Sequence, residues 1–290
     1  MSDTITTAFV EQWDKSIRML SAQMQSRFMS AVTDRGDITG DSFTANLLDP
    51  SGDMPADTVR HGDTVFSDIT HSTRKALMKD FFDALPLDRA DIPKMIVNPI
   101  TGGQYAHTLI GKYNRSAVDK IIYRAARDAA LNSDGSTTAL PAGQKIAHAS
   151  AGFTKAKLIA TRKLFRFNEL DQHNGEELYI GYTADMLEDV LSDTTLTSAD
   201  FLAVQMLQDG DVSKKWMGFN WIPFEGIDPV ATSTYFTIAW AKSAIHFGKG
   251  YMEGRVDRRP DKKNLFQTTL GASTGAVRAK DKGVVEIAYQ

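Results

Sequence analysis

The residues of this chain that can do acid–base or metal chemistry are scattered. The sequence has six histidines, and no two of them stand four residues apart, the helical spacing that places two imidazoles on one metal ion. One short stretch combines Asp171, His173, Glu176 and Glu177. Carboxylates this close together can shift a pKa into the range that is useful for proton transfer. The stretch follows a predicted helix as a loop, so we expect its side chains to be solvated.

Patterns that bind nucleotides or cations are incomplete. Lys112 follows a glycine, but the glycine five residues earlier that a phosphate-binding loop requires is absent. Asp49, Asp53 and Asp57 lack the acidic positions two apart and the closing glutamate of a calcium loop. The chain has no cysteine, which excludes disulfides and thiolate metal sites. We therefore expect no cofactor, no metal and no enzymatic activity, with an unrecognised hydrolase or nuclease site as an alternative.

Charge is nearly balanced along the chain, with 36 acidic and 33 basic side chains and a formal net charge of −3 at pH 7. This balance argues against a protein built wholly around a polyanion. The densest basic cluster surrounds one proline and comprises Arg255, Arg258, Arg259, Lys262 and Lys263. Two aspartates dilute it, and no aromatic side chains interleave as in a binder of single strands. We expect the cluster to pair with charges of a neighbouring subunit, while a nucleic-acid-binding role stays an alternative.

An amphipathic helix is predicted near the start of the chain. Trp13, Ile17, Met24 and Phe28 recur at helical spacing and form a narrow apolar stripe, which Gly36 ends. A narrow stripe suits docking onto another chain, although packing on its own domain explains it equally well. No segment approaches the ~20 apolar residues that cross a bilayer, so we expect no membrane contact.

The next part of the chain has little apolar material. Residues 37–70 are polar and rich in glycine, proline and aspartate. Their extended pieces are too short to form a sheet with a core, so the segment is either disordered or held by neighbours. Residues 72–82 predict a brief helix, and the chain breaks again at Pro99.

The strongest helix signal spans residues 104–131. Apolar residues recur there at helical spacing, and Arg115 with Asp119 and Arg124 with Asp128 form pairs four apart on more exposed positions. We therefore predict one long amphipathic helix.

A second helix begins at Thr154, which can cap its free N–H groups. The face that we expect to be buried comprises Ala156, Ile159, Ala160, Leu164, Phe167 and Leu170. Strands are predicted at residues 177–182, 215–221, 235–240, 265–270 and 284–289, and short helices at 183–191 and 198–207. Helices come mostly first and strands mostly later, which favours an α+β class.

The order of these parts resembles the Hong Kong 97-like fold of the major capsid proteins of tailed double-stranded DNA phages. Several local patterns carry the resemblance, and they lie at residues 59–64, 87–91, 98–99, 140–144, 275–278 and 283–287. Arg115, Asp119, Ile121, Ile122 and Ala125 also match the pattern of the spine helix of that fold. The resemblance covers nearly the whole chain, and the order of the motifs carries more weight than any one of them.

The resemblance implies five parts. They are an N-terminal arm at residues 1–48, an extended loop with its flanks at 49–99, a peripheral domain with the spine helix at 100–175, an axial domain at 176–255, and return strands at 256–290.

The resemblance also implies a non-catalytic function. Such a chain self-assembles as hexamers and pentamers into the icosahedral head shell of the virion, in the cytoplasm of the bacterial host, and encloses double-stranded DNA by weak non-specific contact. Scaffolding, portal and decoration proteins are its implied partners. An encapsulin-type compartment, which shares the fold, is the nearest alternative. We expect inter-subunit contacts at Trp13, Ile17, Arg60, Asp63, Arg115, Arg255, Arg258 and Arg259.

Overall fold

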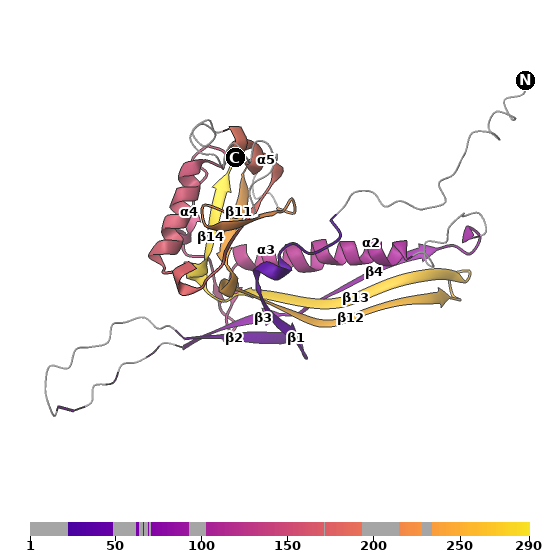
Figure 1. Cartoon of the computed structure of the whole chain (residues 1–290). Coiled ribbons are helices and arrows are strands. Elements are labelled where there is room, and N and C mark those ends of the chain that lie inside the picture. The colour runs from indigo at the N-terminus through magenta and orange to yellow at the C-terminus, as the bar shows by residue number, and fades with distance from the viewer. Residues whose placement is uncertain are drawn as a thin grey trace, which may run out of the picture.

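A computed structural model describes residues 23–48, 62–63, 66, 69, 71–92, 103–170, 172–192, 215–227 and 234–290. Figure 1 shows two regions with different shapes. We define the elongated region as the sheet of β1, β4, β12 and β13 with the helix that lies along it. Its helix and strands lie along one common axis. The compact region, which we define as the six-stranded sheet with α4 and α5, stands on one end of it.

The sheet of the elongated region is built on one long hairpin. β12 (Ile245–Arg259) and β13 (Leu265–Arg278) pair antiparallel over almost their full length, with a register shift between Lys249 and Met252. β4 (Lys79–Leu87) pairs antiparallel with β13, and β1 (Thr33–Asp37) pairs parallel with β12. The strand order is therefore β1-β12-β13-β4.

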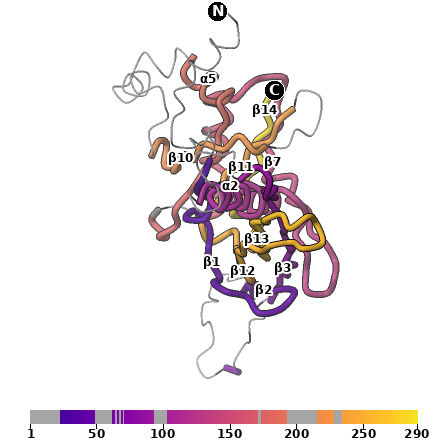
Figure 2. The backbone as a smooth tube through the Cα atoms, turned by 90° about the vertical axis from the view of Figure 1, so that its right-hand side faces the viewer, coloured from indigo at the N-terminus to yellow at the C-terminus, as the bar shows by residue number. Residues whose placement is uncertain are grey.

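A continuous helical run covers this sheet, as the end-on view in Figure 2 shows. It consists of α2 (Gln104–Tyr113), a π-helical segment η3 (Asn114–Asp119) and α3 (Lys120–Arg127). The predicted long helix is therefore confirmed, but it ends four residues early, because Asp128 is extended and Ala130–Leu131 form β5 with β6 (Thr137–Thr138).

Two predictions for the early part of the chain are wrong. The brief helix predicted at residues 72–82 is instead β3 (His71–Leu77), which pairs with β2 (Ser42–Leu48), followed by the start of β4. The helix predicted to end at Gly36 lies partly in residues 1–22, outside the described residues; beyond them, residues 33–37 form β1 and only Met29–Ala31 form a 3₁₀ turn. In both cases pairing with distant strands overrides local spacing.

The compact region has the strand order β7-β14-β11-β8-β10-β9. Its bounds are β7 (Lys145–Ile146), β8 (Leu178–Tyr182), β9 (Lys215–Trp216), β10 (Phe219–Pro223), β11 (Tyr235–Ala241) and β14 (Val284–Tyr289). The strands predicted at 177–182, 235–240 and 284–289 are confirmed. The strand predicted at 215–221 is two strands, because Met217 and Gly218 both have positive φ and turn the chain.

Two helices flank this sheet, α4 (Lys155–Phe167) and α5 (Ala184–Ser192). The predicted face of α4 is wrong: Leu158, Thr161 and Phe165 are buried, whereas Ile159 and Phe167 are 48% and 83% exposed. The helix has two apolar stripes, and the stripe that meets β14 and β7 is the one the structure buries. The α+β class itself is confirmed. The helix predicted at 198–207 lies outside the described residues.

The main core belongs to the compact region and is rich in aromatic side chains. Trp240 is fully buried, stacks on Tyr179 with ring centroids 6.0 Å apart, and donates from its indole Nε1–H to the Ala31 carbonyl at 2.9 Å. Phe28 packs edge-on against Trp240 at 5.1 Å. It comes from residues 23–31, which we call the N-terminal segment. The N-terminal segment is thus part of this core. A second, smaller core lies under β2 and β3 and includes Phe43, Ala45 and Ala76.

Candidate functional site

The acid–base stretch found in the sequence is occupied by structural contacts. Glu176 accepts a hydrogen bond from the Ser243 hydroxyl, and Glu177 accepts one from the Tyr179 hydroxyl at 2.8 Å. That hydrogen bond holds the pKa of Glu177 below its ordinary value, which keeps its carboxyl group ionised. His173 is exposed, and Asp171 lies outside the described residues. The stretch therefore has neither the enclosure nor the raised carboxyl pKa of a general acid.

Residues 271–275 have the Gly-x-Ser-x-Gly spacing of a nucleophile elbow. They lie in the middle of β13, where Ser273 stands opposite Asp80 of β4 in the antiparallel register. A nucleophile elbow needs a sharp turn from a strand into a helix that lifts the serine out of the sheet. A serine in a continuous strand has no such geometry, so this motif is structural.

The described residues include no metal-binding cluster and no membrane-spanning helix. Among the residues that the structure describes, no group of three His, Cys, Asp or Glu side chains is placed to hold a metal ion. The described helices include none that is both long and apolar enough to cross a membrane. Asp49, Asp53 and Asp57, compared above with a calcium loop, lie outside the described residues.

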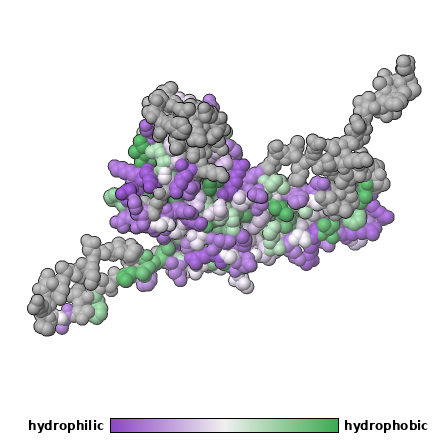
Figure 3. Space-filling view, viewed as in Figure 1, coloured by the Kyte–Doolittle hydropathy of each residue, from purple (hydrophilic) through white to green (hydrophobic). Residues whose placement is uncertain are grey.

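What the elongated region does present is exposed apolar surface. Phe82 is 71% exposed, and Tyr251, Met252 and Val256 on β12 are each exposed by about half. The outer half of β12 is open to solvent over its whole length from Tyr251 to Arg258. Figure 3 shows hydrophobic patches along this part of the molecule. Exposed apolar groups in such number mark a surface that another molecule covers.

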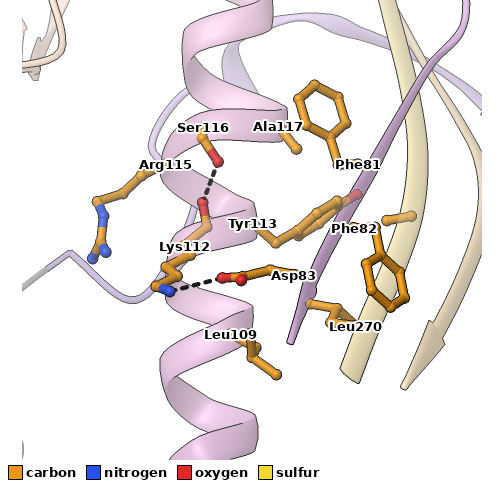
Figure 4. A pocket seen from close by; sticks show the side chains of 11 residues that line it. Phe81, Phe82, Asp83, Leu109, Lys112, Tyr113, Arg115, Ser116, Ala117 and Leu270 are labelled. Atoms are coloured by element: carbon orange, nitrogen blue, oxygen red, sulfur yellow. Dashed lines mark hydrogen bonds and ion pairs between the residues drawn. The ribbon is translucent and has the colours of Figure 1, made fainter. Parts of the chain in front are cut away.

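Two open grooves follow the two sides of α2. A groove of about 440 Å³ separates α2 from the β12–β13 hairpin and is lined by Ile110, Met252, Val256 and other side chains. A groove of about 280 Å³ lies between the helical run and β4. In this second groove Lys112 pairs with Asp83 at 2.7 Å, as the close-up in Figure 4 shows. The Lys112 hydrogen bond holds the pKa of Asp83 below its ordinary value. The helix thus touches its sheet along a narrow line and leaves both flanks open.

Asp119 anchors the N-terminal segment to the helical run. It is completely buried and accepts hydrogen bonds from the Ser26 hydroxyl at 2.6 Å, the Arg27 amide at 3.1 Å and the Phe28 amide at 3.2 Å. Arg115 donates to the Gln23 carbonyl at 2.8 Å. The sequence predicted an exposed pair of Arg115 with Asp119; Asp119 is instead buried, because the N-terminal segment covers it.

Arg278 is a second buried polar centre, and sequence reasoning missed it. Its guanidinium is fully buried and donates to the carbonyls of Ala126, Asp128 and Thr138 at 2.7 to 2.9 Å. It also pairs with Asp281 at 2.7 Å. The carbonyls at the end of α3 need donors, and Arg278 supplies them from β13. An arginine directly after the small and apolar residues Gly275, Ala276 and Val277 was the only signal in the sequence.

The basic cluster lies at the tip of the β12–β13 hairpin. Arg255 pairs with Glu253, and Arg259 pairs with Asp261 at 2.7 Å, while Arg258 is exposed. Lys262 and Lys263 in the turn are exposed as well. Of the other predicted contact residues, Asp63 is exposed, and Trp13, Ile17 and Arg60 lie outside the described residues. Among the described contact residues, Arg255, Arg258 and Arg259 thus lie together at the hairpin tip, whereas Arg115 lies apart from them in the helical run.

Comparison with known proteins shows which structures share this fold. Curated proteins include no match to the chain. Among solved structures, the capsid of cyanophage Pam1 matches with a TM-score of 0.70 at 12% identity, over 98% of this chain and 97% of that chain. The head structure of Helicobacter pylori bacteriophage KHP40 matches with a TM-score of 0.70 at 10% identity, over 100% and 97% of the two chains. A structure of Mycobacterium phage Che8 matches with a TM-score of 0.66 at 16% identity, over 96% and 97%.

These likenesses confirm the Hong Kong 97-like capsid fold that the order of sequence motifs implied. The sequence itself matches the family described as "Phage capsid protein" over residues 5–290, which is nearly the whole chain. The open grooves and exposed strands thus belong to a subunit that assembles into a multimeric shell. The chain belongs to the phage capsid protein family and is a shell-forming, non-enzymatic major capsid protein of the virion.

Proposed function

We propose that this chain forms hexamers and pentamers that close the head of a tailed phage around double-stranded DNA, in the cytoplasm of a bacterial host. The observation that carries the proposal is the pair of open grooves flanking α2, together with the exposed apolar side chains of β12. A subunit with this much uncovered apolar surface is stabilised when neighbours cover it, and many modest contacts together close a shell.

The five-part division also remains a proposal: arm 1–48, extended loop and flanks 49–99, peripheral domain 100–175, axial domain 176–255 and return strands 256–290. Most of the compact region, from β8 to β11, falls in this axial part, whereas α4 and β14 fall in the peripheral domain and the return strands. β12 runs without a break from Ile245 to Arg259 and pairs with β13 over almost its full length. This continuity favours moving the axial boundary back to about residue 244.

We propose only weak, non-specific contact with DNA. Arg258, Lys262 and Lys263 are exposed at the hairpin tip, but acidic neighbours already pair Arg255 and Arg259. A few phosphate contacts give an affinity that salt reduces steeply. Scaffolding, portal and decoration proteins are further proposed partners, since a closed head needs an entry for DNA and a means of setting its size. The remaining contact residues, Trp13, Ile17, Arg60, Asp63 and Arg115, are proposed to lie between subunits.

The test is assembly of the chain in a bacterial host, followed by cryo-electron microscopy of the particles. We expect hollow shells with five-fold and six-fold rings, and DNA inside them when a packaging system is present. Met252→Asp, which places a charge in the groove between α2 and β12, is expected to abolish shells while the subunit stays folded by circular dichroism. Met252→Leu is the matched control and is expected to assemble normally.

Two results contradict the proposal. If the folded wild-type chain stays monomeric at high concentration, the chain does not self-assemble into a shell. Shells that enclose a specific protein and never DNA support the encapsulin-type compartment instead.

A further inference from the structure

Helix α4 carries a basic surface that includes exposed apolar side chains. It has basic residues at positions 155, 157, 162, 163 and 166 and no acidic residue, in a chain whose net charge is −3. Lys157 is buried and donates to the carbonyls of Ala151 and Gly152. Most of the other basic side chains border a shallow hollow of about 480 Å³. We call this hollow the α4 face; it is lined by Ile159, Arg162, Lys163, Arg166, Phe167 and Met217.

The apolar part of the α4 face is costly to leave in water. Ile159 and Phe167 are 48% and 83% exposed, although Leu158 and Phe165 already supply what the core requires. Covering a large apolar side chain completely is worth about 1.5–3 kcal/mol. Figure 3 shows hydrophobic patches that interrupt the hydrophilic surface on the α4 side of the compact region. An occupant with apolar side chains would therefore bind here favourably.

The polar part of the α4 face favours an acidic occupant. The guanidinium of Arg162 lies over the Phe219 ring at 5.8 Å, and its Nη1 atom is buried without a hydrogen-bond acceptor among the described residues. Lys163 and Arg166 are exposed beside it. Exposed basic side chains attract carboxylates of another molecule. DNA would satisfy the charges but would not cover Ile159 and Phe167.

The same subunit presents a complementary acidic surface. Asp185 and Glu188 of α5 are exposed, and Glu225 is exposed while accepting the Ala184 amide at 2.7 Å. Burial raises the pKa of Tyr289, at the end of β14, to about 12, and the charges of Asp185 and Glu225 contribute to the rise. We call Asp185, Glu188 and Glu225 the acidic edge.

The α4 face and the acidic edge lie at opposite ends of the six-stranded sheet. β10 begins at Phe219, next to Met217 of the α4 face, and ends at Pro223, next to Glu225. Five residues of strand span about 17 Å. Figure 1 shows α4 and α5 on different sides of the sheet. The two surfaces therefore cannot meet within one subunit, and a contact between copies has to be head-to-tail.

We propose that the α4 face of one subunit binds the acidic edge of the next subunit in the ring. A head-to-tail contact uses two different surfaces of each copy, and it closes a ring when its rotation matches five or six steps. The inference rests on the proposed function, since it names a contact that holds the proposed hexamers and pentamers together.

Charge reversal with rescue tests the contact. Lys163→Glu with Arg166→Glu, and separately Asp185→Lys with Glu188→Lys, are each expected to lower the yield of shells at least ten-fold. The chain with all four changes is expected to regain most of the yield, because the opposite charges face each other again. Lys79→Glu with Lys282→Glu, at two exposed lysines outside the α4 face and the acidic edge, is the control with the same change in charge and is expected to assemble normally. Circular dichroism and thermal melting confirm that each variant is folded.

Crosslinking gives an independent readout, because the chain has no cysteine. Lys163→Cys combined with Glu188→Cys is expected to give, on oxidation of assembled shells, a ladder of covalent multimers up to the hexamer on a denaturing gel. Each single-cysteine variant is expected to stay monomeric on that gel.

Failure of the contact is distinguishable from failure of the shell. If wild-type chains form shells but the paired reversals assemble as well as wild type, or the four-fold variant gives no recovery, the contact is wrong and the proposed function stands. If the Lys163 and Arg166 reversal leaves shell yield intact and lowers only the DNA content, the α4 face binds DNA and the proposal is overturned. If wild-type chains form no shells, the proposed function itself fails.

Discussion

The compact and elongated regions of this subunit are stabilised in different ways. In the compact region six strands and two helices enclose a shared aromatic core, and side chains such as Trp240, Phe219 and Phe165 have no contact with water. In the elongated region one helix lies on long strands, with a groove open on each side and one half of β12 exposed. One region is stabilised by its own interior, and the other leaves apolar surface for neighbours to cover.

The difference shows how one chain can combine a stably folded core with surfaces for assembly. A subunit with apolar surface everywhere would aggregate, and one with none would not assemble. Here the two demands are met in separate parts of the chain. Mutations in the two regions should therefore affect different measurements, and four predictions test that separation.

The largest effect is expected in the compact core. Trp240→Ala removes a fully buried ring, its contact with Phe28 and its hydrogen bond to Ala31, and should lower the free energy of unfolding by about 3–5 kcal/mol. Guanidinium unfolding of the unassembled subunit measures it. Trp240→Phe keeps much of the volume and should lose roughly half as much. A loss below 1 kcal/mol for the alanine variant would show that this core does not carry the stability.

The second effect is expected where the two regions and the N-terminal segment meet. Asp119→Asn replaces one of two carboxylate oxygens by an NH₂ group, which faces donors from Ser26 and Phe28, and should cost about 2–4 kcal/mol. The N-terminal segment should then become sensitive to protease. Asp128→Asn is the control, because Asp128 is half exposed and its pair with Arg127 is worth at most about 1 kcal/mol. Equal protease resistance of both variants would contradict the anchoring role.

A smaller effect should follow pH at the junction of β1 and β12. Burial, together with the charges of Arg35 and Lys280, lowers the pKa of His246 to about 4, while the Ser243 backbone acts in the opposite direction. In the unfolded chain His246 therefore binds a proton near pH 6.5, whereas in the folded chain it stays neutral until the pH approaches 4. The stability that His246 contributes is therefore complete above pH 6.5 and is lost as pH falls towards 4, by about 1–2 kcal/mol at pH 5.

His246→Gln removes this titration and still offers Arg35 an acceptor. Unfolding of the variant and of wild type at pH 7.5 and pH 5 measures the difference. The variant should lose less stability than wild type between the two values, and parallel losses would exclude His246 as the cause.

The smallest effect on the subunit is expected on the elongated surface. Phe82→Ala removes a ring that is 71% exposed, so the free energy of unfolding should change by no more than about 0.5 kcal/mol. The yield of shells should nevertheless fall, since the ring lines the groove beside β4. Sedimentation of assembled particles measures the yield. If the variant loses stability but assembles normally, Phe82 contributes to the fold of the subunit and not to its assembly.

Sequence reasoning found the elements that obey local rules. The helical run from Gln104 and the strands at Leu178 and Val284 have strong periodicity, and they lie where periodicity predicted them. The segment at 72–82 failed, because its strands exist through pairing with Ser42–Leu48 and with β13, far away in sequence. The prediction of the buried face of α4 was wrong because the helix has two apolar stripes, and only the tertiary fold decides which one is buried.

The polar centres were out of reach for a related reason. Asp119 looks like any exposed acidic residue of a helix until the N-terminal segment is seen to cover it. Arg278 is buried only because α3, β6 and β13 converge on it. Such residues derive their roles from chain segments more than 90 positions apart, and spacing along the sequence carries no record of that.

The placement of Phe28 sets a limit on trimming of the chain. Proteolysis that stops before Gln23 leaves every described contact of the N-terminal segment in place, including the hydrogen bonds to Asp119. A cut after Phe28 would take a ring out of the aromatic core and leave Asp119 buried without acceptable donors. Cleavage before Gln23 therefore leaves the interior of the described residues intact, whereas cleavage after Phe28 breaks that interior up.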